Sequence, residues 1–259
     1  MSEVIVLAHG LFGFGDLVPG FQPVNYFNKV AGLFTTQVIA PQVDPIGAIE
    51  VRGNALADEI LQKTNPKDRV HIIGHSMGGL DARHVITHRG DVSPRIATLV
   101  TIGTPHAGSK VADAVLDRAP VVEALLGLFP EKLRDQIDAI KNLTTAFCKD
   151  FNKRTPDVRG VRYINVAGDA SRAESELPFF KLAARLGGMA GKTNDGVVTR
   201  ESALRDNNEH LDDWPVDHLG EIGWSLETVA IDRGRRESAL KKHLDRYKAM
   251  IGVLNLGSA

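Results

Sequence analysis

Short runs of β-branched and other apolar residues alternate along the chain with segments whose apolar residues recur at helical spacing. The runs predict five strands, at Val4–Ala8, Gln37–Ala40, Val70–Ile73, Ile96–Ile102 and Val161–Val166. Strands that alternate with helical segments are typical of βα units and of a mostly parallel sheet. The pattern therefore predicts an α/β fold.

Three helices are expected between and after these strands. One follows the second strand and is expected to bury a face formed by Val51, Leu56, Ile60 and Leu61. Another begins at Gly79, directly after the third strand, and extends to His88, and a last helix spans Ala239–Leu254. Two helices near the middle of a βα alternation fit a sheet covered on its faces.

Two long stretches interrupt the alternation. Gly108–Asn152 has helical spacing and is interpreted as a cap or lid inserted between two strands, and Gly168–Lys192 is interpreted as a second insertion. Neither has the composition of a flexible linker. Residues 1–259 are therefore expected to form a single domain.

Charge and composition remove several classes of partner. The 259 residues include 31 Lys and Arg against 32 Asp and Glu, a net charge of −1, without a basic block that would bind nucleic acid. The single cysteine, Cys148, excludes an intramolecular disulfide. The start of the chain lacks the features of a secretory signal, and no apolar run is long enough to span a membrane. A cytoplasmic location, or export without a cleavable N-terminal signal, is expected.

The segment Val70–Gly79 carries the clearest chemical signal. It contains G-x-S-x-G directly after a predicted strand and directly before a helix, a context that predicts a nucleophile elbow. In such a turn, side chains in place of Gly74 and Gly78 would collide with the neighbouring strand and helix, and the serine is held in a strained conformation with its hydroxyl exposed. Ser76 is therefore predicted to be a nucleophile.

A serine hydroxyl also needs an oxyanion hole, which backbone N–H groups usually form. One N–H is expected from Met77, the residue after the nucleophile. The other is expected from Leu11, because it lies in a glycine-rich loop, His9–Gly15, that follows the first strand.

The acid and the base are expected to follow Ser76 in that order. His218 is the favoured base, because it lies where a proline-bearing loop meets a new apolar pattern. His210, in a polar loop, remains the alternative, and His243 falls within the last helix, where a surface or packing role is favoured.

Asp195 is the favoured acid. It lies in an Asn-Asp-Gly turn that precedes a β-branched pair, 23 residues before His218. Because Asp-Gly is also a common turn, other acidic residues remain candidates: Asp169, Glu174, Asp212, Asp213 and Asp217.

Six segments, spread in order over most of the chain, carry a resemblance to a known family. They are Val6–Gly10, Glu50–Gly53, Gly74–Gly79, Gly103–Ser109, Asn194–Val198 and Asp217–Leu219. Together they resemble the bacterial true lipases of the Pseudomonas, Burkholderia and Proteus group. The resemblance implies an α/β-hydrolase fold with a mostly parallel central sheet flanked by helices, lacking the first two strands and carrying a small helical cap or lid.

The resemblance also implies site residues. The catalytic triad falls on Ser76, Asp195 and His218, and the oxyanion hole on Leu11 and Met77. An arginine that braces the oxyanion loop in the family falls on Arg52. A mobile lid would correspond to Val121–Pro130, with a packed cap helix as the alternative interpretation of that segment. The substrate pocket and lid would use Phe12, Leu125, Leu126, Leu128 and Phe129.

One family feature is missing. Many members hold calcium near the histidine loop through two aspartates and backbone carbonyls. Gly220 stands where one aspartate would be, and Arg172–Ser175 offers no match for the other. Because calcium binding depends on carboxylate oxygens, the calcium site is expected to be absent, and no metal or organic cofactor is predicted.

These features predict a serine ester hydrolase, a lipase or lipolytic carboxylesterase that cleaves acylglycerols and simple carboxylic esters through an acyl-enzyme. Another acyl hydrolase on the same scaffold (thioesterase, phospholipase, amidase or polyester depolymerase) is the alternative, because these enzymes share the triad chemistry. The expected partners are a small ester or lipid and, transiently, lipid surfaces. The oligomeric state does not follow from the sequence.

Overall fold

The computed structural model describes residues 2–11, 13, 26–117 and 138–254. Six strands form one sheet in the order β2-β1-β3-β4-β5-β6, and every neighbouring pair is parallel. The strands are β1 (Glu3–Ala8), β2 (Gln37–Ile39), β3 (Arg69–His75), β4 (Ile96–Ile102), β5 (Arg162–Val166) and β6 (Glu209–His210). The five predicted strands are confirmed, and β6 was not predicted.

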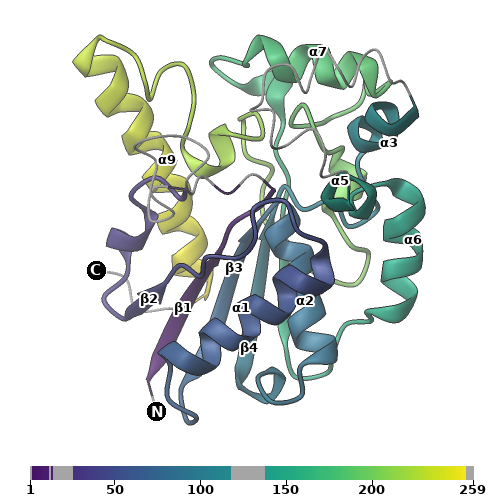
Figure 1. Cartoon of the computed structure of the whole chain (residues 1–259). Coiled ribbons are helices and arrows are strands. Elements are labelled where there is room, and N and C mark those ends of the chain that lie inside the picture. The colour runs from purple at the N-terminus through teal and green to yellow at the C-terminus, as the bar shows by residue number, and fades with distance from the viewer. Residues whose placement is uncertain (1, 12, 14–25, 118–137, 255–259) are drawn as a thin grey trace.

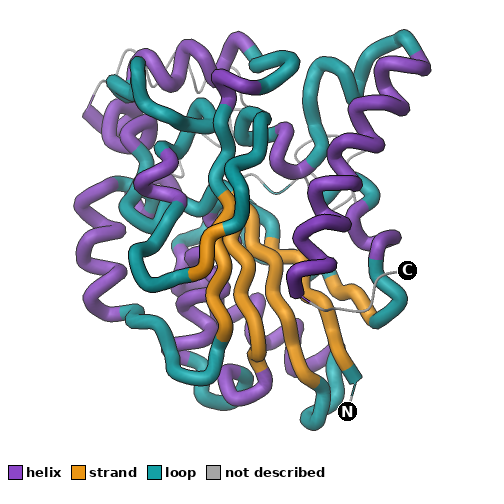
Figure 2. Tube along the Cα trace, turned by 180° about the vertical axis from the view of Figure 1, so that it is seen from behind, coloured by secondary structure: helices purple, strands orange, loops and turns teal. Residues whose placement is uncertain are grey.

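Helices cover both faces of the sheet. The helices α1 (Ile49–Lys63) and α2 (Met77–His88) lie on one face, in front of the strands in Figure 1. They pack on β1, β3 and β4 through one apolar cluster. The helix α9 (Arg233–Leu254) lies on the other face, seen from behind in Figure 2, and packs through a second cluster. Two buried layers on a parallel sheet confirm the predicted α/β-hydrolase architecture.

The helices of the two insertions lie beyond the carboxyl ends of the strands, toward the top of Figure 1, except for the last helix before β5, which runs down the side of the sheet. Between β4 and β5 these are α3 (Lys110–Asp117), α5 (Asp138–Asn142) and α6 (Thr145–Arg154), and after β5 come α7 (Pro178–Leu186) and α8 (Arg200–Ala203). Four short 3-10 turns complete the described elements: Val30–Leu33, Ser93–Arg95, Ala170–Arg172 and Gly220–Ile222. In parallel sheets, ligands bind at this end.

The predicted buried face of α1 is partly wrong. Leu56 and Ile60 are buried, but Val51 and Leu61 are 58% and 38% exposed. The buried face instead continues through Arg52, which is fully buried because Asp81 of α2 pairs with its guanidinium. A charged residue that is neutralised by a partner can thus occupy a core position where an apolar pattern predicts none.

None of the helices in the described part of the chain combines the length and the apolar character that crossing a membrane requires.

Candidate active site

Ser76 occupies a sharp turn between β3 and α2. Its backbone angles are φ 53° and ψ −128°, outside the regions that an L-residue ordinarily adopts. A Cβ atom at Gly74 would lie 2.7 Å from the backbone nitrogen of Gly79, and one at Gly78 would collide with the carbonyl oxygen of Ala8. Both glycines of the G-x-S-x-G segment are therefore required by the close approach of strand and helix.

Arg52 holds the loop that precedes Leu11. Its guanidinium donates to the carbonyl oxygens of His9 at 2.8 Å and Gly10 at 3.3 Å, and its Nε donates to Asp81 at 2.9 Å. Leu11 follows directly and lines the same cavity as Ser76. The buried ion pair thus fixes the segment on which one of the two expected oxyanion donors lies.

His218 and Asp195 are in direct contact. The Nδ1 atom of His218 lies 2.7 Å from Oδ2 of Asp195, and the backbone N–H of His218 donates to the Asp195 carbonyl at 2.9 Å. The other carboxylate oxygen of Asp195 accepts from the N–H groups of Val197 and Val198 at 2.8 and 2.6 Å. The Asn-Asp-Gly turn therefore presents a rigid carboxylate to the imidazole, which lines the cavity beside Ser76.

The competing histidines lie elsewhere. His210, in the edge strand β6, lies 2.9 Å from Asp213 on a partly exposed surface. His243 is buried in α9, with its Nε2 atom 3.0 Å from the carbonyl oxygen of Asn28. His243 thus packs in the core, in line with the prediction for that residue.

The competing acids also have other partners. Asp217 accepts backbone N–H groups of Leu177 and Gly220 at 2.9 and 2.8 Å, and burial raises its pKa to about 6. Asp169 accepts from the N–H of Ser171 at a turn. These carboxylates shape the loops around His218, and of the acids proposed from sequence Asp195 is the one whose carboxylate contacts the imidazole within the described chain.

Glu221 is a second buried carboxylate beside His218 that the sequence analysis missed. Its Oε2 atom lies 3.4 Å from Nδ1 of His218 and 3.0 Å from Nε2 of His75, and its side chain is fully buried. In the sequence it is one more acid in a loop. Its position three residues after His218, where a 3-10 turn brings it back toward the imidazole, is the only local signal.

Tyr26 and His75 connect the two halves of the site. The Tyr26 hydroxyl accepts the N–H of Gly10 at 2.9 Å and lies 2.8 Å from Nδ1 of His75. The Nε2 atom of His75 lies 3.0 Å from the carbonyl oxygen of His218, which can only accept, so Nε2 carries the proton and Tyr26 donates to Nδ1. This buried chain ties the oxyanion loop to the backbone of His218.

Burial and charge set the protonation of these groups. Burial and the neighbouring His218 hold the pKa of His75 well below its usual range, so His75 is neutral, as its hydrogen bonds require. Burial lowers the pKa of His218, but the carboxylates of Asp195 and Glu221 raise it by more, so the net shift is upward. The arrangement makes His218 a strong proton acceptor once it is deprotonated.

An apolar cavity of about 420 Å³ opens onto Ser76 and His218. Its described wall is formed mainly by aliphatic and aromatic side chains of α3, α5 and α7 and of Leu143, which follows α5. The residues that contribute most of this wall are Val111, Ala112, Val115, Ile140, Leu143, Phe179, Phe180 and Ala183. The proposed lid and pocket residues Phe12, Leu125, Leu126, Leu128 and Phe129 lie outside the described residues.

Among the residues that the structure describes, one cluster brings possible metal ligands together, and its members contact one another. His75, His218 and Glu221 bring three ligand atoms within 4.8 Å. However, Nε2 of His75 is a donor to the His218 carbonyl, and Nδ1 of His218 faces Asp195. The protons that these contacts require occupy the positions that a metal would need.

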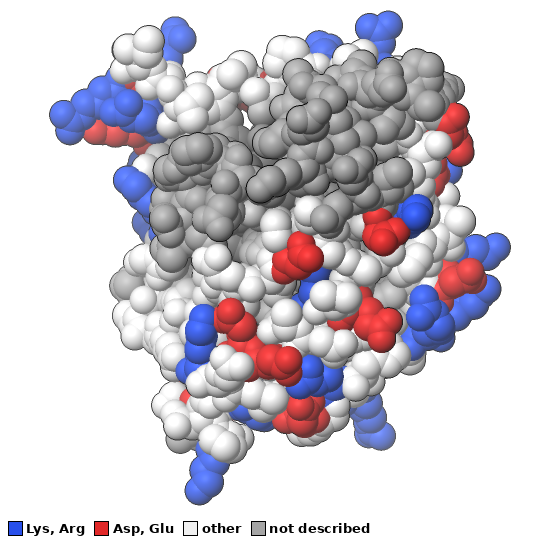
Figure 3. Space-filling view, viewed as in Figure 1, with Lys and Arg blue, Asp and Glu red and all other residues white. Residues whose placement is uncertain are grey.

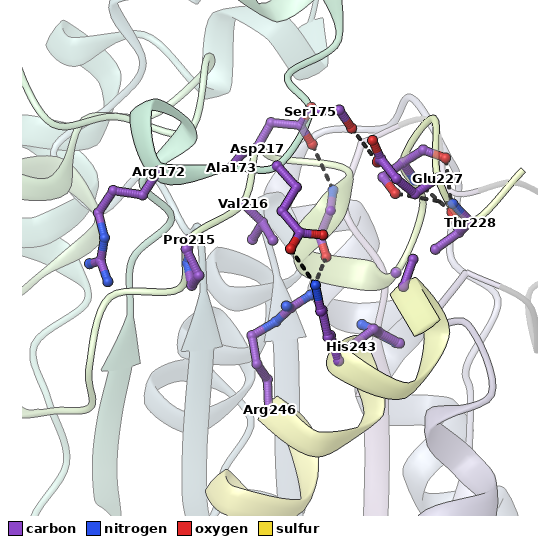
Figure 4. Close-up of a pocket in the computed structure, with 16 residues that line it drawn as sticks. Arg172, Ala173, Ser175, Pro215, Val216, Asp217, Glu227, Thr228, His243 and Arg246 are labelled. Atoms are coloured by element: carbon purple, nitrogen blue, oxygen red, sulfur yellow. Dashed lines mark hydrogen bonds and ion pairs between the residues drawn. The ribbon is translucent and has the colours of Figure 1, made fainter. Parts of the chain in front are cut away.

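A second cavity lies where the family resemblance implies a calcium ion, beside the His218 loop. Figure 4 shows this second cavity, about 190 Å³, between the His218 loop, the segment around Ser175 and α9. Arg246 donates to the carbonyl oxygen of Gly220 at 3.3 Å, and Lys242 pairs with Glu174. Each carboxylate oxygen of Asp217 accepts one backbone N–H, from Leu177 and from Gly220. The cavity also holds the carboxylate of Glu227, which accepts from the Ser175 hydroxyl. Because each carboxylate already has a partner in the protein and Gly220 offers no side-chain oxygen, these residues fit a calcium site poorly.

Comparison with known proteins agrees with this geometry. Residues 54–155 match the family model of the PGAP1-like alpha/beta domain. A triacylglycerol lipase of Vibrio cholerae is 29% identical over 94% of this chain and 87% of its own length, and triacylglycerol lipase 2 of Saccharomyces cerevisiae is 34% identical over 72% of this chain and 58% of its own length. A Bacillus licheniformis lipase structure has a TM-score of 0.66 at 24% identity, over 85% of this chain and 86% of that one.

The solved structure shares the fold, and the curated relatives share sequence over most of the chain. The protein is a serine ester hydrolase of the lipase and esterase type.

Proposed function

We propose that this chain is a lipase or lipolytic carboxylesterase that cleaves acylglycerols and simple esters through an acyl-enzyme on Ser76, and that it belongs to the bacterial true lipases of the Pseudomonas, Burkholderia and Proteus group. The observation that carries the proposal is the apolar cavity of about 420 Å³ beside Ser76 and His218. Such a cavity suits a hydrocarbon acyl chain, whereas a peptide or a charged thioester carrier needs polar partners.

Catalysis is proposed to follow the two halves of acyl transfer. His218 takes the hydroxyl proton as Ser76 attacks the ester carbonyl, while Asp195 holds the imidazole tautomer and stabilises the imidazolium. The N–H groups of Leu11 and Met77 bind the oxyanion. His218 then protonates the leaving alcohol, and water repeats the sequence on the acyl-enzyme to release the acid.

Rates on p-nitrophenyl esters from acetate to palmitate, together with a triglyceride below and above its solubility limit, test the proposal. The cavity predicts a kcat/KM that rises from acetate to chains of medium length, because each methylene that leaves water contributes about 0.8 kcal/mol. Higher kcat/KM on an acyl-coenzyme A thioester, an anilide or a phospholipid than on any neutral ester would favour the alternative acyl hydrolases instead.

Replacing Asp195 is expected to be damaging but not complete. Asp195→Asn should lower kcat by at least about 10²-fold, because the imidazole loses the acceptor that fixes its tautomer. The loss should be smaller than for the nucleophile, since the Glu221 carboxylate remains 3.4 Å from Nδ1. The double variant Asp195→Asn with Glu221→Gln should lose further activity.

Asp217→Asn serves as the matched control for that series. Asp217 lies next to His218 in sequence, but its carboxylate accepts two backbone N–H groups. Its replacement should therefore lower Tm and leave kcat close to the wild-type value. If Asp217→Asn reduced kcat more than Asp195→Asn does, the acid has been assigned to the wrong aspartate.

We further propose that the enzyme needs no calcium. Neither EDTA nor added calcium should shift Tm by more than about 2 °C at fixed ionic strength, because the loop of His218 is held by Asp217, Arg246 and burial. A ligand at 100 times its Kd stabilises by about 2.7 kcal/mol, and each kcal/mol shifts Tm by about 2–4 °C for a chain of this size. A large drop with EDTA, reversed by calcium and not by magnesium, would contradict the proposal.

A further inference from the structure

The corner of the molecule where α9 begins exposes apolar and basic side chains together. Leu226, Val229, Ile231, Arg233, Arg235 and Arg236 form this corner, which we call the α9 tip. The three apolar residues are 48%, 59% and 99% exposed, and all three arginines are exposed. Single exposed apolar residues are common on protein surfaces, but three within six residues beside three arginines form an amphipathic surface.

The basic residues of the tip are placed against a local rule. Arg233, Arg235 and Arg236 lie in the first turn of α9, which contains no acidic residue, although Arg233 pairs with Glu237 in the next turn at 2.7 Å. Cations at a helix N-terminus are unfavourable, because the helix dipole is positive there. Between Leu226 and Lys242 the chain has five basic and three acidic residues, a net charge of +2, whereas the whole chain carries −1. A sequence that departs from local preference in this way is typical of a functional surface.

Hydrogen bonds fix the backbone on both sides of the tip. The Trp224 indole donates to the backbone carbonyl of Tyr26 at 3.2 Å, and the Asp232 carboxylate caps the helix by accepting the N–H of Arg235 at 2.7 Å. Below the tip, Tyr247 of α9 is buried and donates to the carbonyl of Glu221, next to the catalytic loop. The helix that begins at the tip thus contacts the loop that carries His218 further along its length.

The tip and the helix that lines the cavity reach the same edge of the molecule. In Figures 1 and 2 the start of α9 and α7 both rise at the end where the strands finish, and Figure 3 shows Lys and Arg side chains on that corner. The inner side of α7 lines the cavity with Phe180 and Ala183, while Leu182 on its outer side is 52% exposed. Lys181 and Arg185 beside Leu182 are also exposed.

We propose that the α9 tip and the outer side of α7 dock on an anionic phospholipid bilayer, with the apolar side chains inserted among the acyl chains and the arginines at the headgroups. Apolar side chains flanked by Lys and Arg bind at lipid interfaces, and anionic headgroups attract each cation near the surface. The inference rests on the proposed function, because an enzyme that takes esters from a lipid surface must turn its cavity toward it.

Co-sedimentation of the full chain with phosphatidylcholine vesicles, with and without phosphatidylglycerol, tests this docking. Binding should require phosphatidylglycerol and weaken as salt is added, because exposed charges are screened. Val229→Asp and Ile231→Asp together should reduce the vesicle partition coefficient by at least about tenfold, because two inserted side chains are lost. Replacing Arg233, Arg235 and Arg236 by Gln should abolish the preference for phosphatidylglycerol.

Val51→Asp is the matched control. Val51 is 58% exposed, almost the same as Val229, but it lies on α1, which covers the opposite face of the sheet. This variant should bind vesicles like the wild type. All variants should hydrolyse soluble p-nitrophenyl butyrate at the wild-type rate, since none of these residues lines the catalytic cavity.

Soluble ester hydrolysis separates this proposal from the proposed function. If the chain hydrolyses esters but binds no anionic vesicles, the docking proposal is wrong and the proposed function stands. If it binds vesicles but hydrolyses no ester, the proposed function is wrong and the docking proposal stands. Equal loss of binding in Val51→Asp, or a dimer that dissociates in the Val229→Asp and Ile231→Asp variant and binds no vesicles, would also overturn it.

Discussion

Ser76→Ala is expected to lower kcat for ester hydrolysis by about 10⁶-fold, the loss seen when a triad serine is removed from the best-studied serine protease. The hydroxyl is the only group of this residue that reacts. Its backbone N–H still donates to the carbonyl oxygen of Ile102, and its carbonyl still accepts from Thr104, both at 2.9 Å. Alanine has the same Cβ as serine, so the strained turn costs the same in both proteins.

The comparison needs kcat and an unfolding curve on the same preparation. The variant should keep the wild-type Tm within a few degrees, and an organophosphonate should label the wild type at Ser76 and leave the variant unlabelled. A kcat of Ser76→Ala within tenfold of the wild-type value would show that Ser76 is not the nucleophile.

Local constraints explain why the sharp turn that holds Ser76 could be predicted from the sequence. The two glycines are required by contacts with Gly79, three residues after the nucleophile, and with Ala8 of the neighbouring strand. The five-residue pattern G-x-S-x-G, placed between an apolar run and a helix, is therefore enough to predict the strand–turn–helix geometry around the serine. The same holds for Asp195, whose carboxylate is held by the N–H groups of the two valines that follow Gly196.

Contacts between distant segments explain what could not be predicted. Glu221 meets His75 across 146 positions, and Tyr26 meets His75 across 49. No spacing rule relates such residues, so Glu221 looks like any loop acid. Arg52 was identified by the family resemblance alone, because a pattern of apolar residues assigns charged residues to the surface of α1. The structure places it in the core with Asp81.

The edge strand β6 was missed for a related reason. Glu209 and His210 are exposed and polar, and two residues give no alternation to detect. They join the sheet because β5 offers a parallel partner, with Ile164 opposite Glu209 and Asn165 opposite His210. The strand also separates His210 from the cavity that Ser76 lines: at the sheet edge His210 lies beside Asp213.

His218→Ala is expected to lower kcat nearly as much as Ser76→Ala does. The members of a triad act as a unit, so a serine that has lost its base contributes almost nothing to the rate. The imidazole lines the cavity with Ser76, and its Nδ1 atom lies 2.7 Å from Asp195. Removing it also leaves the carboxylates of Asp195 and Glu221 buried without their shared partner, which costs folding free energy. Unfolding curves are therefore required beside kcat.

His210→Ala is the matched control, since it removes an imidazole that also lies beside a carboxylate, Asp213 at 2.9 Å, but at the exposed sheet edge. It should keep kcat within about threefold of the wild type, because exposed ion pairs contribute little. His218→Gln separates chemistry from packing, because glutamine partly fills the space of the imidazole but cannot act as a base. Compared with His218→Ala, its Tm should move back toward the wild-type value, whereas its kcat should stay as low. Activity lost with His210 and kept without His218 would move the base to the sheet edge and the acid to Asp213.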